Sequence, residues 1–236
     1  MESAVKVENL VKHYGDVEAV KAVSFDVQPE QIFGLIGPNG AGKTTILRIL
    51  STLLSVTSGS VNIMGYNLQK NPESIRRIIS YLPEDAGAYK NLTGREYLNF
   101  IANFFGHKQK MVEKGIEIAD LAGRIDDKVE TYSKGMKRRL LVGRALMNNP
   151  RLAILDEPTS GLDVVNAQEI RNLIKNTTDD GTTVIVSSHN MLEVEFLCDH
   201  IVLIDDGVIV EQGKPSALMD KHKAKNIEEV FTQVVK

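Results

Sequence analysis

Hydrophobic and polar residues alternate with two different periods along this chain, and the change of period divides the chain into parts. Up to residue 82, and again from residue 152, apolar residues form short runs that are typical of strands. From Thr93 to about Asn148 they recur every three to four residues, as on amphipathic helices. A helical block between two strand-bearing parts predicts an inserted helical lobe.

The strand-bearing parts themselves differ in their pattern. Residues 5–27 alternate in strand fashion around a turn at Gly15-Asp16, which predicts an N-terminal antiparallel β element. The last third alternates between strands and helices, which predicts a mostly parallel sheet with helices on its faces. Its predicted elements are strand 152–155, helix 164–176, strand 183–186, helix 191–197, strand 201–204 and a returning hairpin arm at 208–210.

One glycine-rich loop lies between a buried strand, 32–36, and a helix that the pattern predicts over 45–54. It matches G-x-x-x-x-G-K-T, and with the next threonine it comprises Gly37, Pro38, Asn39, Gly40, Ala41, Gly42, Lys43, Thr44 and Thr45. Backbone N–H groups of such a loop, together with a helix N-terminus, hold phosphate. Lys43 would reach the β- and γ-phosphates, and the Thr44 hydroxyl would ligate Mg²⁺. Because the strand–loop–helix setting disfavours a chance match, we predict that the chain binds a nucleoside triphosphate.

Two further strands end in polar side chains that suit phosphate chemistry. Strand 152–155 ends in Asp156 and Glu157, and His189 follows strand 183–186. Ligands of open α/β sheets bind at the carboxyl ends of the strands. We therefore expect Asp156 at Mg²⁺, Glu157 as the general base that activates water, and His189 at the γ-phosphate. The alternatives are a solvated acidic turn and a structural histidine.

Composition and charge argue against nucleic-acid-binding, membrane-spanning and disulfide-bonded classes of protein. The 236 residues carry a formal net charge of −3, so no basic excess indicates nucleic-acid binding. No apolar run approaches the ~18 residues of a membrane span, and Met1-Glu2-Ser3 does not resemble a signal peptide. The single cysteine, Cys198, excludes an internal disulfide, and we expect it to be buried in a cytosolic protein.

The motifs, taken in order, resemble the nucleotide-binding subunit of an ABC transporter over nearly the whole chain. The resemblance implies that Tyr14 is the A-loop aromatic that stacks on the base and that Asp163 lies in the D-loop. The family signature falls at 132–136, where Ser133 and Gly135 would contact the γ-phosphate of a partner's nucleotide. In the Q-loop, Glu84 stands where most of the family has glutamine, and it could ligate Mg²⁺ and orient water.

Three departures from the family pattern point to one branch of the family. They are Glu84 in the Q-loop and Lys134 and Met136 in the signature, where the second glycine position and the glutamine are replaced. These departures resemble the branch that serves drug, lipid, polysaccharide and sodium exporters. The implied fold is α/β, with a RecA-like P-loop NTPase core over 1–84 and 150–215. A helical lobe over 85–149 and a helical tail over 216–236 complete it.

The resemblance also implies cofactors and partners. ATP and Mg²⁺ would be bound between two cassettes, identical or different, that dimerise head-to-tail. Separate membrane-spanning permease subunits would dock beside residues 84–92 and the helix from Thr93, which places the chain on the cytoplasmic face of the cell membrane. We expect Tyr97, Phe100 and Phe104 to form lobe core rather than docking surface.

Two other functions compete with transport. One is a soluble ABC ATPase of translation or DNA maintenance, which the short separation of the phosphate loop and the signature and the absence of a heptad run disfavour. The other is a nucleotide-gated binding module without catalysis, which the presence of Asp156, Glu157 and His189 disfavours. The sequence does not identify the transported substrate, and the direction of transport depends on the branch resemblance.

Overall fold

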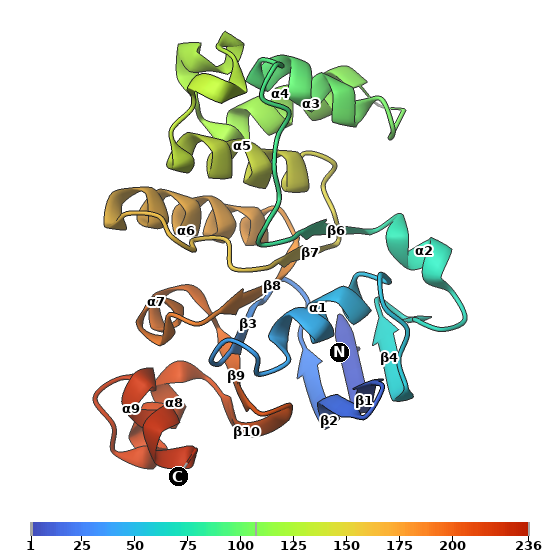
Figure 1. Ribbon diagram of the computed structural model, residues 1–236, viewed down its shortest axis with the longest axis vertical. Helices are drawn as coiled ribbons and strands as arrows, with labels where there is room; N and C mark the ends of the chain where they lie inside the picture. Colours follow the sequence, from blue (N-terminus) through green and yellow to red (C-terminus); the bar gives the residue numbers. More distant parts are fainter. Residues whose placement is uncertain (1, 107, 236) are drawn as a thin grey trace.

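The computed structural model describes residues 2–106 and 108–235 (Figure 1). Residues 1, 107 and 236, which the predicted domain ranges include, lie outside the described residues. Among the helices of the described part, none has the length and apolar character needed to cross a membrane.

A six-stranded sheet forms the centre of the molecule. Its strands follow the order β10-β9-β3-β8-β7-β6, and all neighbours are parallel except β9 and β10, which form an antiparallel hairpin. The strands are β3 (Ile32–Ile36), β6 (Ile79–Leu82), β7 (Leu152–Leu155), β8 (Thr183–Ser188), β9 (His200–Asp205) and β10 (Val208–Gly213). The predicted mostly parallel sheet and its returning hairpin arm are confirmed.

A second, four-stranded sheet is antiparallel throughout, in the order β2-β1-β4-β5. It contains β1 (Val5–Tyr14), β2 (Val17–Val27), β4 (Ser58–Ile63) and β5 (Tyr66–Asn67). The predicted N-terminal antiparallel element is therefore confirmed, and two strands from beyond the phosphate loop complete it.

The six-stranded sheet is buried on both faces, as strand β3 illustrates. Phe33 and Leu35 pack toward the antiparallel sheet and the helix after the phosphate loop, whereas Ile32 and Ile36 belong to the hydrophobic core on the other side. Because strand side chains alternate between faces, a strand that is buried on both sides reads as a continuous apolar run.

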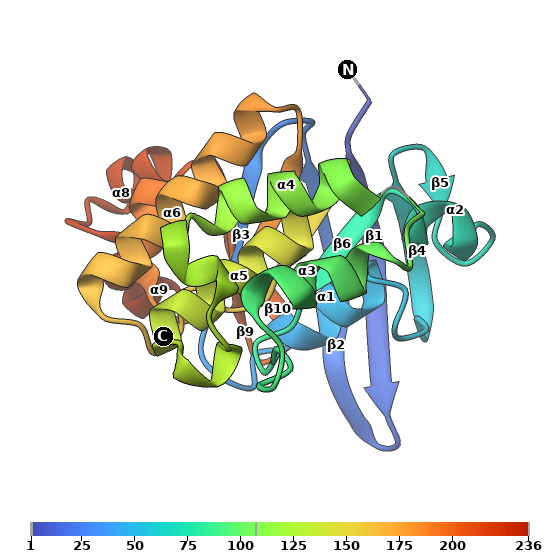
Figure 2. The ribbon, with the colours of Figure 1, turned by 90° about the horizontal axis from the view of Figure 1, so that it is seen from above.

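The helices surround this sheet. They are α1 (Lys43–Leu50), α2 (Pro72–Arg76), α3 (Gly94–Ala102), α4 (Lys108–Ala119), α5 (Lys134–Leu146), α6 (Val164–Asp179), α7 (Met191–Leu197), α8 (Pro215–His222) and α9 (Ile227–Val234). In Figure 1, α3, α4 and α5 lie together at the top of the molecule, and Figure 2 looks down on these three helices. The boundaries between core, lobe and tail stay a prediction.

Two sequence expectations about helices are wrong. The helix predicted over 45–54 ends at Leu50, and Thr52 beyond it has a left-handed backbone with φ 61°. The predicted lobe-core face holds only in part, because Tyr97 is buried but Phe100 and Phe104 are 39% and 73% exposed. Helix α3 ends at Ala102, so apolar residues beyond it no longer lie on the buried face of that helix.

The expectation for Cys198 is confirmed. The cysteine is buried against β3, where a Cβ placed on Gly34 would lie 2.9 Å from the Cys198 sulfur. Burial also raises the pKa of the Cys198 thiol, so the side chain behaves as a small apolar core residue.

Candidate active site

The phosphate loop connects the end of β3 to the start of α1. Gly40 and Gly42 have positive φ values of 86° and 101°, which glycine adopts without strain. A Cβ on Gly37 would lie 2.0 Å from the carbonyl oxygen of Ile204, so this position has room only for glycine. Gly42 precedes α1 and makes no side-chain cap. The N–H groups of the first turn are therefore available to an anion.

Lys43 is buried at the base of this loop. Its Nζ donates to the carbonyl oxygens of Gly37 at 2.7 Å and Pro38 at 3.1 Å, and it lies 3.7 Å from Glu157 Oε1. Burial lowers the pKa of the Lys43 ammonium, and the charges of Glu157, Asp156 and Glu84 oppose that shift. The loop therefore holds a desolvated cation close to three carboxylates.

Asp156 lies at the end of β7, 1% exposed, among three hydroxyl groups. Ser187 Oγ and Thr44 Oγ1 donate to its Oδ1 at 2.5 and 3.4 Å, and the Tyr81 hydroxyl donates to its Oδ2 at 3.4 Å. Burial and the neighbouring Asp156 charge raise the pKa of Tyr81 to about 12, so the phenol stays protonated as a donor. The predicted neighbourhood of Thr44 and Asp156 is present, whereas the sequence analysis missed the roles of Ser187 and Tyr81.

Glu157 is 4% exposed, and it adopts a left-handed backbone with φ 48°, which is rare for a residue with a side chain. Its N–H donates to Ser187 Oγ at 2.9 Å, and its Oε2 lies 2.8 Å from His189 Nδ1. Its Oε1 is buried without a hydrogen-bond partner among the described residues. The structure thus brings Glu157 and His189 together and leaves one carboxylate oxygen available for a hydrogen bond.

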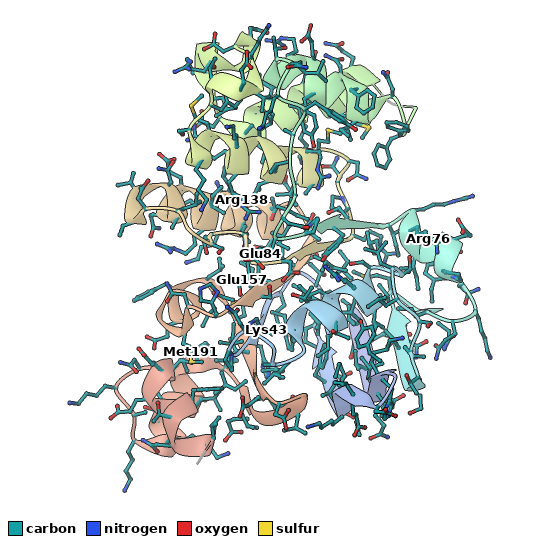
Figure 3. The ribbon with its side chains drawn as sticks, viewed as in Figure 1. Lys43, Arg76, Glu84, Arg138, Glu157 and Met191 are labelled. Carbon is teal, nitrogen blue, oxygen red and sulfur yellow. The ribbon has the colours of Figure 1, made fainter. Side chains whose placement is uncertain are left out.

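Glu84 reaches the same place from the loop after β6. With Asn39, Gly40, Lys43 and Glu157 it lines a cavity of 160 Å³ at the phosphate loop. Figure 3 shows Glu84, Glu157 and Lys43 one after another between the three lobe helices and the phosphate loop. The structure therefore brings the phosphate loop, the Q-loop and the carboxyl end of β7 together in one site.

The signature and D-loop residues lie elsewhere and cap helices. Ser133 Oγ accepts from Met136 N at 3.2 Å at the start of α5, and Asp163 Oδ1 accepts from Asn166 N at 3.0 Å at the start of α6. Hydrogen bonds from Asn166 also lower the pKa of Asp163. A Cβ on Gly135 would lie 1.9 Å from Asn166 Oδ1, so the two caps pack against each other. The lining of the 160 Å³ cavity includes neither Ser133 nor Asp163.

Tyr14 ends strand β1, 46% exposed, with the Lys12 ammonium 5.3 Å from its ring centre. It does not belong to the residues that line the phosphate-loop cavity. An exposed ring can stack on a base, and this role of Tyr14 stays a prediction.

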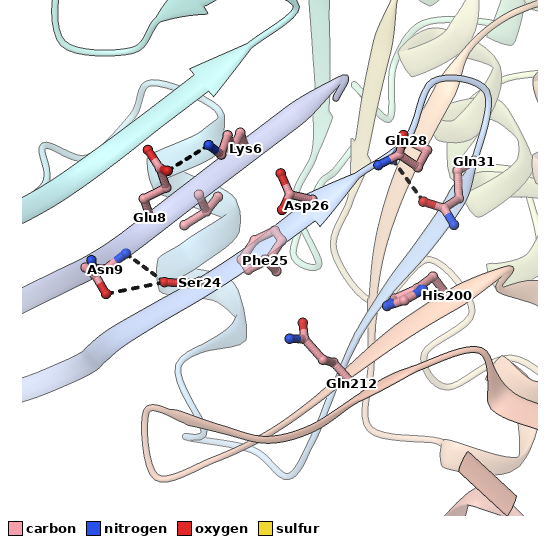
Figure 4. A pocket seen from close by; sticks show the side chains of 11 residues that line it. Lys6, Glu8, Asn9, Ser24, Phe25, Asp26, Gln28, Gln31, His200 and Gln212 are labelled. Carbon is pink, nitrogen blue, oxygen red and sulfur yellow. Dashed lines mark hydrogen bonds and ion pairs between the residues drawn. The ribbon is translucent and has the colours of Figure 1, made fainter. Parts of the chain in front are cut away.

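A larger cavity, of 630 Å³, lies between the strands β1 and β2 and the residues Gln31, His200 and Gln212 (Figure 4). None of the predicted site residues lines it. Six of its polar lining residues pair with one another through the contacts Lys6–Glu8, Asn9–Ser24 and Gln28–Gln31. This cavity lacks a phosphate-binding loop, so we assign the nucleotide site to the 160 Å³ cavity.

Comparison with known proteins identifies the family of the chain. A family model described as ABC transporter matches residues 20–160. The chain belongs to the ABC transporter family. The linearmycin resistance ATP-binding protein LnrL of Bacillus subtilis (strain 168) is 38% identical to it, over 92% of this chain and 71% of that protein. The bacitracin transport ATP-binding protein BcrA of Bacillus licheniformis is 40% identical, over 90% of this chain and 70% of that protein.

A solved structure extends the comparison to the fold and the reaction. A dimeric ATP-binding cassette in a post-hydrolysis state, bound to ADP and phosphate, is 28% identical with a TM-score of 0.78. The match covers 89% of this chain and 98% of that chain. The ABC ATPase fold that we predicted is confirmed. The chain is an ATP-binding and ATP-hydrolysing subunit that powers transport, as the sequence predicted.

Proposed function

We propose that this ABC ATPase hydrolyses Mg²⁺-bound ATP with Glu157 as the general base. The observation that carries the proposal is the Glu157 carboxylate, which is buried between His189 and Lys43 and has one oxygen that accepts no hydrogen bond from the described residues. A buried carboxylate without a full set of donors can accept a proton from a positioned water. His189 holds the other oxygen and so fixes the orientation of the carboxylate.

The side chains present fit ATP and Mg²⁺. The phosphate-loop amides and Lys43 would bind the phosphates, and Thr44, Asp156 and Glu84 would supply oxygen ligands to the metal. The described residues contain no group of three or more His, Cys, Asp or Glu side chains that could hold a metal ion by themselves. This suits Mg²⁺, which binds through one or two carboxylates together with phosphate and water. Bound Mg²⁺ would offset phosphate charge.

We infer that two cassettes complete each site. The 160 Å³ cavity is smaller than the ~300–1,000 Å³ of ordinary ligand pockets, and Ser133 and Gly135 lie outside it. A head-to-tail dimer would bring the signature of one cassette to the phosphate loop of the other. The dimeric state of the solved relative supports this arrangement, and the second cassette can be the same chain or a different one.

A surface of three exposed aromatic residues, Tyr89, Phe100 and Phe104, supports docking of a permease beside the Q-loop. The rings of Tyr89 and Phe100, and of Phe100 and Phe104, meet edge to face with centroids 5.4 Å apart. Contiguous exposed apolar groups are typical of interaction sites. Tyr89 follows Glu84 by five residues. A membrane-spanning subunit that binds here would therefore contact the segment that carries Glu84, from the cytoplasmic face of the cell membrane.

We propose export as the direction of transport. The names of two relatives, a linearmycin resistance protein and a bacitracin transport protein, and the Glu84, Lys134 and Met136 departures support it. The transported substrate remains to be identified by isolating the permease.

Glu157→Gln tests the base assignment. The amide keeps the shape of the side chain but cannot accept a proton, so we expect ATP turnover to fall by about 10²–10⁴-fold while ATP binding persists. Stalled hydrolysis should also accumulate the ATP-bound dimer, which size-exclusion chromatography would detect. A variant that turns over ATP at the wild-type rate would remove Glu157 from the base role.

Affinity capture from detergent-solubilised native membranes tests the partner. We expect a multi-spanning protein to co-purify with ATPase activity, and Phe104→Ser to weaken that association. Capture of ribosomal or DNA-bound partners without a membrane protein would favour the soluble ATPases of translation or DNA maintenance instead.

A further inference from the structure

A buried arginine joins the signature helix to the active site. Arg138 lies on α5, five residues after Ser133, and it is 8% exposed. Its Nη2 donates to the backbone carbonyl oxygen of Glu84 at 3.2 Å and to that of Glu157 at 3.4 Å. In Figure 3, Arg138 stands next to Glu84 on the lobe side of the site. One guanidinium group therefore connects the signature helix, the Q-loop and the proposed base.

The surroundings of Arg138 favour a guanidinium that stays charged although it is buried. Burial lowers the pKa of its guanidinium, and the charges of Glu84, Asp156 and Glu157 oppose that shift. Removing an arginine from water is unfavourable unless opposite charges and hydrogen-bond acceptors compensate. All of the named compensating groups belong to the active site rather than to the lobe.

The contact with Glu157 is made at an unusual backbone position. A residue with a side chain at φ 48° persists only where its surroundings hold it. Ser187 Oγ accepts the Glu157 N–H, and Arg138 Nη2 donates to the Glu157 carbonyl oxygen. Ser160 N also donates to the Glu157 carbonyl oxygen, at 3.1 Å, and together these contacts hold the main chain on both sides of the Glu157 side chain. A shift of Arg138 would therefore change where the carboxylate lies.

Arg138 also retains an unused donor. Its Nη1 is buried and has no hydrogen-bond partner among the described residues. Buried donors without partners are uncommon in folded proteins, and each one calls for a functional role or for a partner beyond the described residues. Nη1 is the part of Arg138 that can form a new hydrogen bond when the site changes.

We propose that Arg138 is a positioning residue that links the placement of the signature helix to the placement of Glu84 and Glu157. When α5 moves with Ser133 onto a partner's nucleotide, Arg138 transmits that displacement to the carbonyl groups of Glu84 and Glu157. The base then reaches its working position only in a closed dimer. This inference rests on the proposed role of Glu157 and adds a coupling between the two motifs.

The test compares two arginines on the same helix in the full chain. Arg139 is the next residue, and its Nη1 donates to Glu169 Oε2 at 2.9 Å, away from the nucleotide cavity. We expect Arg138→Met to lower kcat by ~10–100-fold with the ATP KM within about threefold, because positioning is lost and nucleotide binding is not. Arg139→Met should leave kcat within about twofold and affect only the melting temperature.

Conservative variants keep the test decisive if Arg138→Met folds poorly. Arg138→Lys retains a charged donor for one carbonyl oxygen and should recover part of kcat, and Arg138→Gln should recover less. The inference is overturned if Arg138→Met retains wild-type kcat, or if KM rises as steeply as kcat falls. It is also overturned if Arg139→Met lowers kcat equally.

A failure of the proposed function gives a different result. If Glu157→Gln hydrolyses ATP at the wild-type rate, the base assignment is wrong whatever Arg138 does. If Glu157→Gln is inactive and Arg138→Met is fully active, only the coupling is wrong.

Discussion

The phosphate-loop site and the signature end of α5 differ in how far their polar side chains are buried and in where their hydrogen-bond partners lie. Around the phosphate loop, Lys43, Asp156 and Glu157 are at least 95% buried and bind one another or nearby hydroxyl groups. At the signature, Ser133 is exposed at its helix end, and its hydroxyl is satisfied by a local cap. Buried polar groups are costly and need complete networks, whereas exposed caps hold their shape alone.

This difference in burial corresponds to different roles of the two regions. The buried network holds the charges close to one another within the cassette, as phosphate binding and proton transfer require. The capped signature keeps its local structure while it stays exposed, as the proposed contact with a second cassette requires. The comparison gives predictions that separate effects on binding from effects on turnover.

The largest expected effect comes from Lys43→Met paired with Ser133→Asp. Lys43→Met removes the buried cation, so ATP binding should weaken by ~10-fold or more and hydrolysis should be lost. Ser133→Asp keeps an N-cap side chain but brings a negative charge toward the partner's phosphates. It should therefore lose hydrolysis while retaining ATP binding, as equilibrium binding of a fluorescent ATP analogue would show.

Mixing the two variants sharpens the comparison. In a mixed dimer, one site combines the intact phosphate loop of the Ser133→Asp chain with the intact signature of the Lys43→Met chain. If the chain pairs with itself, we expect hydrolysis to return on mixing. Equal loss of ATP binding in both variants would contradict the division, because the signature would then act on its own chain's nucleotide.

A smaller effect is expected at a partly exposed network near the C-terminus, formed by Glu211, Lys221 and His222. Glu211 is 14% exposed on its side chain and accepts from Lys221 at 2.6 Å and His222 at 2.8 Å. Burial alone would raise the pKa of Glu211, but the hydrogen bonds from Lys221 and His222 outweigh it and hold the pKa at about 2. Because this lies below the ordinary value of 4.5, the contacts stabilise the fold above pH 4.5 and are lost as the pH falls toward 2.

Glu211→Gln should therefore lower the free energy of unfolding by about 1–3 kcal/mol at pH 7, and by progressively less as the pH approaches 2. Denaturant melts at pH 7 and at pH 3 would measure the difference, with the exposed Glu117→Gln as the matched control. ATP hydrolysis at 25 °C should not change. A stability difference that grows on acidification would have the wrong sign and would contradict the assignment.

The smallest effect is expected at the start of α3. Thr93 Oγ1 accepts from Glu96 N at 3.1 Å, and Glu96 Oε2 accepts from Thr93 N at 2.8 Å, which forms a capping box. Thr93→Ala should lower the free energy of unfolding by ~1 kcal/mol in a denaturant melt. Thr178→Ala, whose hydroxyl donates within its own helix, should stay within ~0.5 kcal/mol of wild type. Equal effects of the two substitutions would show that the capping box contributes nothing specific.

Local patterns predicted the parts of the molecule that local forces determine. The phosphate loop and the strands of the parallel sheet each depend on a few consecutive residues, and the sequence located them. The neighbourhood of Glu157 and His189 also followed, because parallel strands bring their carboxyl ends to one edge.

Contacts that depend on how separate elements pack against one another were not predicted from the sequence. Arg138 reads as one more polar residue on an amphipathic helix, and only the packing of α5 against the Q-loop places it on two carbonyl groups. Tyr81 and Ser187 contribute hydroxyls to Asp156 from two different strands. Periodicity also misled where a helix ended early, since Phe104 continues the apolar pattern beyond Ala102.

The burial of Cys198 makes the native chain a ready background for fluorescent labelling. Its thiol is packed against Gly34, and its raised pKa keeps thiolate scarce at neutral pH. Since it is the single cysteine of the 236 residues, maleimide dyes should react only with cysteines that are introduced on the surface. A donor–acceptor pair on α4 and on the β1–β2 turn would then report by energy transfer whether the helices α3, α4 and α5 move relative to the sheets during turnover.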